Sequence, residues 1–111
     1  MANIQRIDNI PALDELIARS NQTPVWIFKH SLTCPISSHA WSEFQRFAAD
    51  SPVDGPICAV IEIQLARPVS NAVAERTGVR HESPQILLLR EGRVAWQASH
   101  YGISREALRG A

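Results

Sequence analysis

The sequence lacks three features that each define a class of protein. It has only two cysteines in 111 residues, Cys34 and Cys58, and therefore no Cys-x-x-Cys pair. Its eleven basic and eleven acidic residues cancel to zero formal charge, which gives no footprint for nucleic acid or an acidic membrane. Apolar runs such as residues 86–89 are far too short to span a bilayer. We therefore expect no nucleic-acid partner and no membrane partner.

Two further absences bear on location and metal binding. Residues 1–6 contain no apolar signal core, so we expect a cytoplasmic location. No cysteines and histidines have the spacing of metal ligands. His39 follows Cys34 by five residues on a predicted helix, which is more than one turn. We therefore expect no metal site.

The residues that are present predict a single domain over residues 1–111. Hydrophobic residues make up 45% of the chain, enough for one core. Apolar periodicity predicts strands over residues 4–7, 25–29, 57–63, 85–90 and 93–98. It predicts helices from near Pro11, over residues 35–49 and 68–77, and from about Ser104. In the second helix, the polar residues Glu43, Gln45 and Arg46 fall on the outward face.

The order of these elements predicts an α/β fold of the thioredoxin-like type. From residue 25 onward it runs strand, helix, strand, helix, strand, strand, helix. Parallel strands need the crossover helices found here, and Glu91-Gly92 is short enough to join the last two strands as a hairpin. The expected architecture is a central mixed sheet with helices on both faces.

Cys34 stands at the place where this fold carries a reactive sulfur. Pro35 suits the first helical position, so Cys34 falls at the N-cap, preceded by Thr33. A sulfur there faces unpaired amides and the positive helix end, which favour the thiolate that disulfide exchange needs. Ser37 replaces the second cysteine of a dithiol enzyme, and its hydroxyl can donate to the thiolate. Cys34 is thus the predicted catalytic residue, supported by Thr33, Pro35 and Ser37.

Two further groups of residues are expected beside Cys34. Ser83-Pro84 precedes the hairpin, where this fold brings a proline, usually with a cis peptide bond, against the sulfur. Such a bond would present a backbone edge to an extended thiol substrate. Basic residues at or beside strand ends on the same side predict a cationic rim. They are Lys29, His30, His81 and His100.

Three segments together resemble the monothiol bacilliredoxins, a thioredoxin-like family with a Thr-Cys-Pro-Ile-Ser active site. They are residues 29–38, 81–85 and 98–104. The resemblance implies a thiol-disulfide oxidoreductase that removes bacillithiol from protein mixed disulfides through Cys34, which becomes S-bacillithiolated. It also implies bacillithiol as co-substrate, no permanently bound cofactor, and S-bacillithiolated client proteins and a low-molecular-weight thiol as partners. The cationic rim would suit the malate carboxylates of bacillithiol.

Two other functions stay open on the sequence. One is an iron-sulfur carrier of the monothiol glutaredoxin type, although Pro35-Ile36 replaces the Gly-Phe of that group's motif. The other is a non-catalytic thioredoxin-fold binding module in which Cys34 is incidental. Cys58, in the middle of a predicted strand, is expected to be a small buried hydrophobe and not a resolving cysteine.

Overall fold

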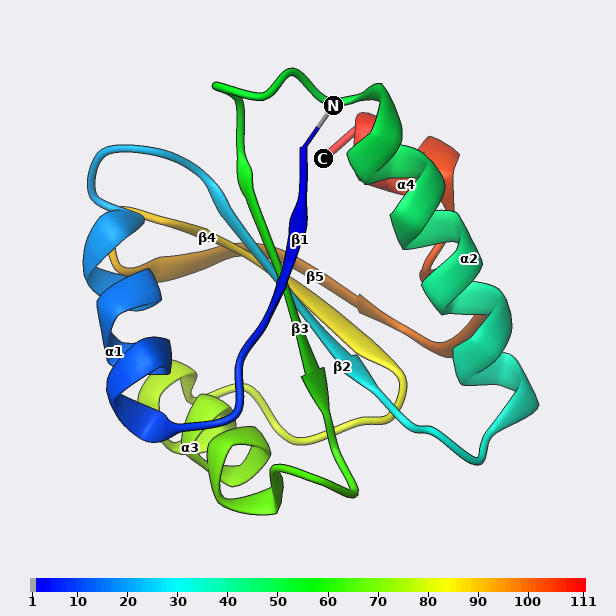
Figure 1. Cartoon of the computed structure of the whole chain (residues 1–111), viewed down its shortest axis with the longest axis horizontal. Helices are drawn as coiled ribbons and strands as arrows, with labels where there is room; N and C mark the ends of the chain where they lie inside the picture. Colours follow the sequence, from blue (N-terminus) through cyan, green and yellow to red (C-terminus); the bar gives the residue numbers. More distant parts are fainter. Residues whose placement is uncertain (1) are drawn as a thin grey trace.

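The structure is a computed structural model that describes residues 2–111. Strands and helices alternate along most of the chain before a closing hairpin (Figure 1). The strands are β1 (Ile4–Arg6), β2 (Val25–His30), β3 (Ile57–Glu62), β4 (Gln85–Arg90) and β5 (Arg93–Ser99). The helices are α1 (Ile10–Arg19), α2 (Pro35–Asp50), α3 (Arg67–Thr77), the 3-10 helix η1 (His100–Gly102) and α4 (Arg105–Arg109).

The strands form one mixed sheet in the order β1-β3-β2-β4-β5. β1, β3 and β2 are parallel, whereas β4 runs antiparallel to β2, and β5 runs antiparallel to β4. Between the parallel strands β2 and β3, Trp26 lies opposite Cys58 and His30 lies opposite Glu62. The predicted α/β thioredoxin-like fold is therefore confirmed.

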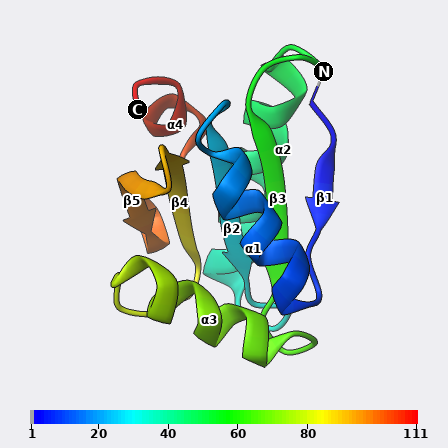
Figure 2. The same cartoon turned by 90° about the vertical axis from the view of Figure 1, so that its left-hand side faces the viewer.

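Helices cover both faces of the sheet, with α1 and α3 on one face and α2 and α4 on the other (Figures 1 and 2). Alternation along β2 supplies both cores. Val25 and Ile27 join the core beneath α1 and α3, whereas Trp26 and Phe28 join the core beneath α2 and α4. Burial of each such side chain stabilises the fold by roughly 1.5–3 kcal/mol. Because β2 is covered on both faces, its first four residues, 25–28, are all apolar.

The β4–β5 hairpin forms as its two-residue loop predicts. Glu91 and Gly92 both have positive φ, at 54° and 74°, and Arg90 pairs with Arg93 across the turn. Two central residues of positive φ define the type I′ turn, whose twist matches that of the flanking strands. Glycine at the second position adopts this conformation without steric cost.

Helix ends follow local capping chemistry. Asn9 Oδ1 accepts a hydrogen bond from Ala12 N–H at 2.8 Å and starts α1. Gly78, with φ of 72°, ends α3. Helix α3 begins at Arg67, one residue before the predicted start. The 3-10 helix η1 was not predicted. Among residues 2–111, no helix combines the length and apolar character needed to cross a membrane.

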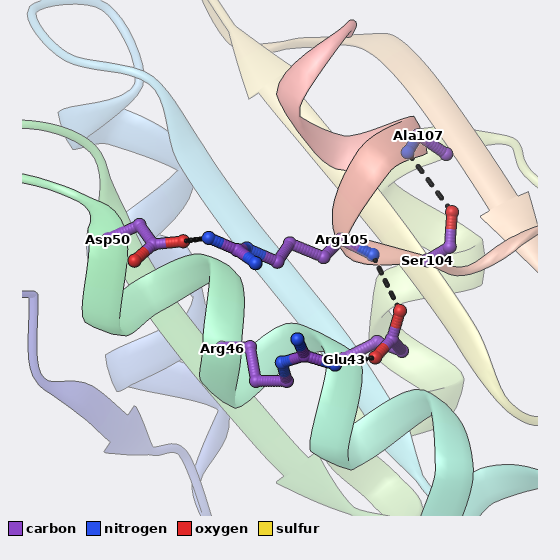
Figure 3. Close-up of polar contacts among 6 residues, drawn as sticks. All are labelled: Glu43, Arg46, Asp50, Ser104, Arg105 and Ala107. Atoms are coloured by element: carbon purple, nitrogen blue, oxygen red, sulfur yellow. Dashed lines mark hydrogen bonds and ion pairs between the residues drawn. The ribbon is translucent and has the colours of Figure 1, made fainter.

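Polar contacts fasten α4 to α2 (Figure 3). Ser104 caps α4 by accepting from Ala107 N–H at 3.1 Å. Arg105 donates its backbone N–H to Glu43 Oε1 at 3.1 Å, and its guanidinium pairs with Asp50. The expectation that Glu43 faces outward is wrong, because its carboxylate accepts the backbone N–H of Arg105 at the start of α4.

Candidate active site around Cys34

Cys34 is the N-cap of α2 and follows directly from the loop that leaves β2. Its backbone is extended, with φ of −104° and ψ of 122°, and Pro35 opens the helix behind it. The side chain is partly accessible and accepts no capping hydrogen bond from the first helical turn. The expected amide donors therefore do not bind the sulfur directly. Cys34 is left as an accessible thiol at the positive end of a 16-residue helix.

Ser37 lies beneath this cap and is fully buried. Its Oγ accepts a hydrogen bond from Ser31 N–H at 2.9 Å and lies 2.7 Å from His30 Nδ1. From the sequence we expect its hydroxyl to donate to the Cys34 sulfur, whereas both of its hydrogen bonds in the structure go to His30 and Ser31. Ser37 therefore braces the loop that carries Cys34.

His30 is held in the proton state that this contact needs. Its ring contacts those of Phe28 and Trp41, with centroids 5.6 Å and 5.4 Å away, and these two rings also stack on each other. Burial is the main influence on the pKa of His30 and lowers it below its ordinary value, whereas the Glu62 carboxylate acts in the opposite direction. A neutral ring is therefore favoured at neutral pH. The tautomer that fits has an unprotonated Nδ1, which accepts the Ser37 hydroxyl proton.

The Ser83-Pro84 peptide bond is cis, as predicted. It precedes Gln85, which pairs with Lys29 at the edge of the sheet where β2 leads towards Cys34. The carbonyl of Pro84 accepts a hydrogen bond from His100 N–H at 3.1 Å, and η1 in turn packs against α2. The Ser-Pro loop, the turn at His100 and α2 are thus joined at this edge.

The expected cationic rim is only partly present. Lys29 and His30 are buried, with 0% and 9% of their surface exposed. Lys29 pairs with both β3 and β4, and His30 extends β2 one residue beyond its predicted end and pairs with Glu62 of β3. His81 is exposed and His100 half-buried, so these two alone of the four offer accessible polar groups. Partial burial and the charge of Lys29 lower the pKa of His81, with Glu82 opposing and Arg67 assisting. His81 is therefore mainly uncharged at neutral pH.

Gln64 is a residue of this site that the sequence did not reveal. It stands in the loop between β3 and α3, and its carboxamide contacts the residues immediately before Cys34, including Thr33. The carboxyl ends of parallel strands meet at one edge of a sheet, which is the signal that could have paired this loop with the loop after β2.

Cys58 cannot resolve an adduct on Cys34. It is fully buried on β3, and burial raises the pKa of its thiol to about 11. It pairs with Trp26, four residues before His30 on β2, so about 13 Å of strand separates it from the edge that carries Cys34. A disulfide needs Cα atoms within roughly 7 Å. Both cysteines are free.

The site thus combines one accessible thiol, a buried serine in the resolving position and a cis-proline loop. Within residues 2–111, no group of three or more His, Cys, Asp or Glu side chains could hold a metal ion. A family model for the monothiol bacilliredoxin BrxC matches residues 5–108. This chain belongs to the monothiol bacilliredoxin family.

Solved structures show the same fold as this member of the monothiol bacilliredoxins. A protein with a thioredoxin fold superposes with a TM-score of 0.85 at 30% identity, over 96% of this chain and 91% of its own. A thioredoxin variant from Halobacterium salinarum has a TM-score of 0.73 at 16% identity, covering 97% and 86% of the two chains. Thioredoxin from Malassezia sympodialis reaches 0.76 at 14% identity, covering 99% and 88%. The two thioredoxins share the fold alone. Family and fold together support a thiol oxidoreductase.

Proposed function

We propose that this protein is a monothiol oxidoreductase that removes bacillithiol from S-bacillithiolated client proteins. The Cys34 thiolate attacks the bacillithiol sulfur of the mixed disulfide, and the bond between that sulfur and the client sulfur breaks. The client leaves as a thiolate and takes up a proton, while Cys34 becomes S-bacillithiolated. One disulfide replaces another, so the step needs no cofactor. A second bacillithiol or a separate reductase then regenerates the Cys34 thiol.

The observation that carries this proposal is the single accessible sulfur. Ser37 stands where a dithiol enzyme has its resolving cysteine, and Cys58 is buried about 13 Å along the sheet. An adduct on Cys34 therefore has no intramolecular route of release and persists until another thiol arrives. The family match supports bacillithiol as that thiol. We assign the activity to the cytoplasm, because a single reduced cysteine functions in a compartment that keeps thiols reduced.

Recognition of bacillithiol is part of the same proposal. Its malate carboxylates need positive or donating groups, and His81 supplies a neutral donor at the exposed surface. Arg67 at the start of α3 is exposed, and its positive charge contributes to the lowered pKa of His81. We assign carboxylate binding to Arg67 and His81 in place of the four-residue rim.

Release of client thiol from a mixed disulfide tests this function. The same client protein is loaded with bacillithiol or with glutathione, and the appearance of its free thiol is followed with each. The proposal predicts faster release from the bacillithiol adduct, no release by Cys34→Ser, and a several-fold slower reaction for Arg67→Gln. Arg19→Gln, at the end of α1, is the matched control. Equal rates for the two adducts would remove the bacillithiol assignment, and activity in Cys34→Ser would remove the mechanism.

A further inference from the structure

The loop before Cys34 is tied to a second loop by one side chain. Gln64 lies two residues after β3 and 32 residues from Leu32, yet its Oε1 accepts a hydrogen bond from Leu32 N–H at 3.0 Å. Its Nε2 donates to Ser31 Oγ at 3.0 Å and to Thr33 Oγ1 at 3.4 Å. One carboxamide therefore uses its acceptor and both donor hydrogens on three consecutive residues.

This contact secures the part of the loop that Ser37 does not reach. Ser37 holds the Ser31 N–H from the buried side. Leu32 and Thr33 are both exposed, and Leu32 N–H donates its hydrogen bond to Gln64. Without Gln64, the two residues that lead into Cys34 would lose these side-chain hydrogen bonds.

We propose that Gln64 is a positioning residue for disulfide exchange at Cys34. It fixes residues 31–33 so that the sulfur approaches an incoming disulfide along the axis of the bond that breaks. A disulfide on a client protein can approach Cys34 from few directions, so its reaction depends strongly on where the Cys34 sulfur points. A small alkylating reagent can approach from many directions, so its reaction depends on this orientation far less. The inference rests on the proposed exchange reaction at Cys34, but it does not depend on which small thiol the mixed disulfide contains.

The neutral carboxamide matters as well as its hydrogen bonds. A carboxylate at position 64 could still accept from Leu32 N–H, and the hydroxyls of Ser31 and Thr33 could turn their protons towards it. It would also set a negative charge beside the reacting sulfur and disfavour the thiolate. Gln64→Glu therefore preserves the hydrogen bonds to residues 31–33 and alters the charge. Gln64→Met preserves the length of the side chain and removes these hydrogen bonds.

Two rates measured on each variant separate positioning from thiol reactivity. One is exchange of Cys34 with a glutathione mixed disulfide of a client protein, and the other is alkylation of Cys34 by iodoacetamide. We expect the ratio of exchange to alkylation to fall about tenfold in Gln64→Met and to stay within about twofold of wild type in Gln64→Glu. Gln45→Met, on the exposed face of α2, is the matched control and keeps the wild-type ratio.

Amide hydrogen exchange checks the contact itself. Leu32 N–H should lose protection in Gln64→Met and keep it in Gln64→Glu, with unfolding temperatures close to wild type because Gln64 is exposed. An unchanged ratio in Gln64→Met overturns the positioning role while the exchange function stands. A proportional fall of both rates in Gln64→Met also overturns the positioning role, because a change in the reactivity of the Cys34 thiol itself would then explain the result. A wild-type protein that exchanges with no mixed disulfide overturns the proposed function and this inference together.

Discussion

Lys29 is the only lysine of the chain, and it is fully buried. Its Nζ has no hydrogen-bond partner among residues 2–111, and neither does Oε1 of Gln85, its neighbour on β4. Burial lowers the pKa of Lys29 from 10.5 to about 8. A cation in this position opposes folding, because the ammonium leaves water without an ion-pair partner.

Lys29→Met should therefore stabilise the protein. At pH 7 the gain should be about 1–3 kcal/mol, because an unpaired buried charge is replaced by an apolar chain of similar length. Between pH 8 and 10.5 the unfolded chain binds the lysine proton and the folded chain does not. The free energy of unfolding of the wild type therefore rises with pH across that window. The difference by which Lys29→Met is more stable than wild type should shrink accordingly. Urea unfolding of both proteins at pH 7 and pH 10 measures the difference. An advantage that grows with pH would contradict this reading.

Ser37 offers a second prediction for a single residue. Removal of its hydroxyl in Ser37→Ala leaves the buried Ser31 N–H and His30 Nδ1 without their partner. The free energy of unfolding should fall by about 1–3 kcal/mol. Ser38→Ala is the adjacent control, because Ser38 is exposed and should change stability by less than about 0.5 kcal/mol. Equal effects in denaturant titrations would show that the buried hydrogen bonds do not brace the loop.

The contact between α2 and α4 shows how a charged side chain can join two helices. Glu43 accepts the Arg105 backbone N–H, and Arg46 lies 3.3 Å from its other carboxylate oxygen. The hydrogen bond from Arg105 is the main cause that lowers the pKa of Glu43. Helix α4 has only five residues and cannot be stable alone, so it depends on contacts of this kind.

Glu43→Gln should loosen α4 without unfolding the sheet. The loss of charge assistance should cost about 1 kcal/mol at neutral pH. A carboxyl whose pKa is lowered in the folded state stabilises the protein fully when the pH is above its ordinary, unfolded-state pKa. This contribution to stability disappears as the pH falls through the lowered, folded-state pKa. The difference between wild type and Glu43→Gln should thus narrow in acid. Urea unfolding at pH 7 and pH 3, with Glu15→Gln on α1 as control, tests this. A difference in the free energy of unfolding that is larger at pH 3 than at pH 7 would refute this role of the Glu43 carboxylate.

At the scale of the whole molecule, local patterns predicted most of the fold. The periodicity of residues 35–49, the Glu91-Gly92 turn and the Ser83-Pro84 segment each depend on nearby residues, and the structure agrees with each. The burial of Lys29 and the contacts of Gln64 depend on which loops and strands meet, and one sequence does not encode that pairing locally. The roles of the predicted site residues in catalysis stay predictions.

Intact-mass spectrometry is the most direct test that Cys34 is a single-cysteine exchange nucleophile for bacillithiol. Wild type, Cys34→Ser and Cys58→Ser are each incubated with a bacillithiol-loaded client, and peptide mapping locates any adduct. Wild type and Cys58→Ser should each gain one bacillithiol on Cys34 while the client loses it, and Cys34→Ser should gain none and leave the client modified. A wild-type protein without an adduct on Cys34, or a Cys34→Ser variant that still strips the client, would contradict the assignment.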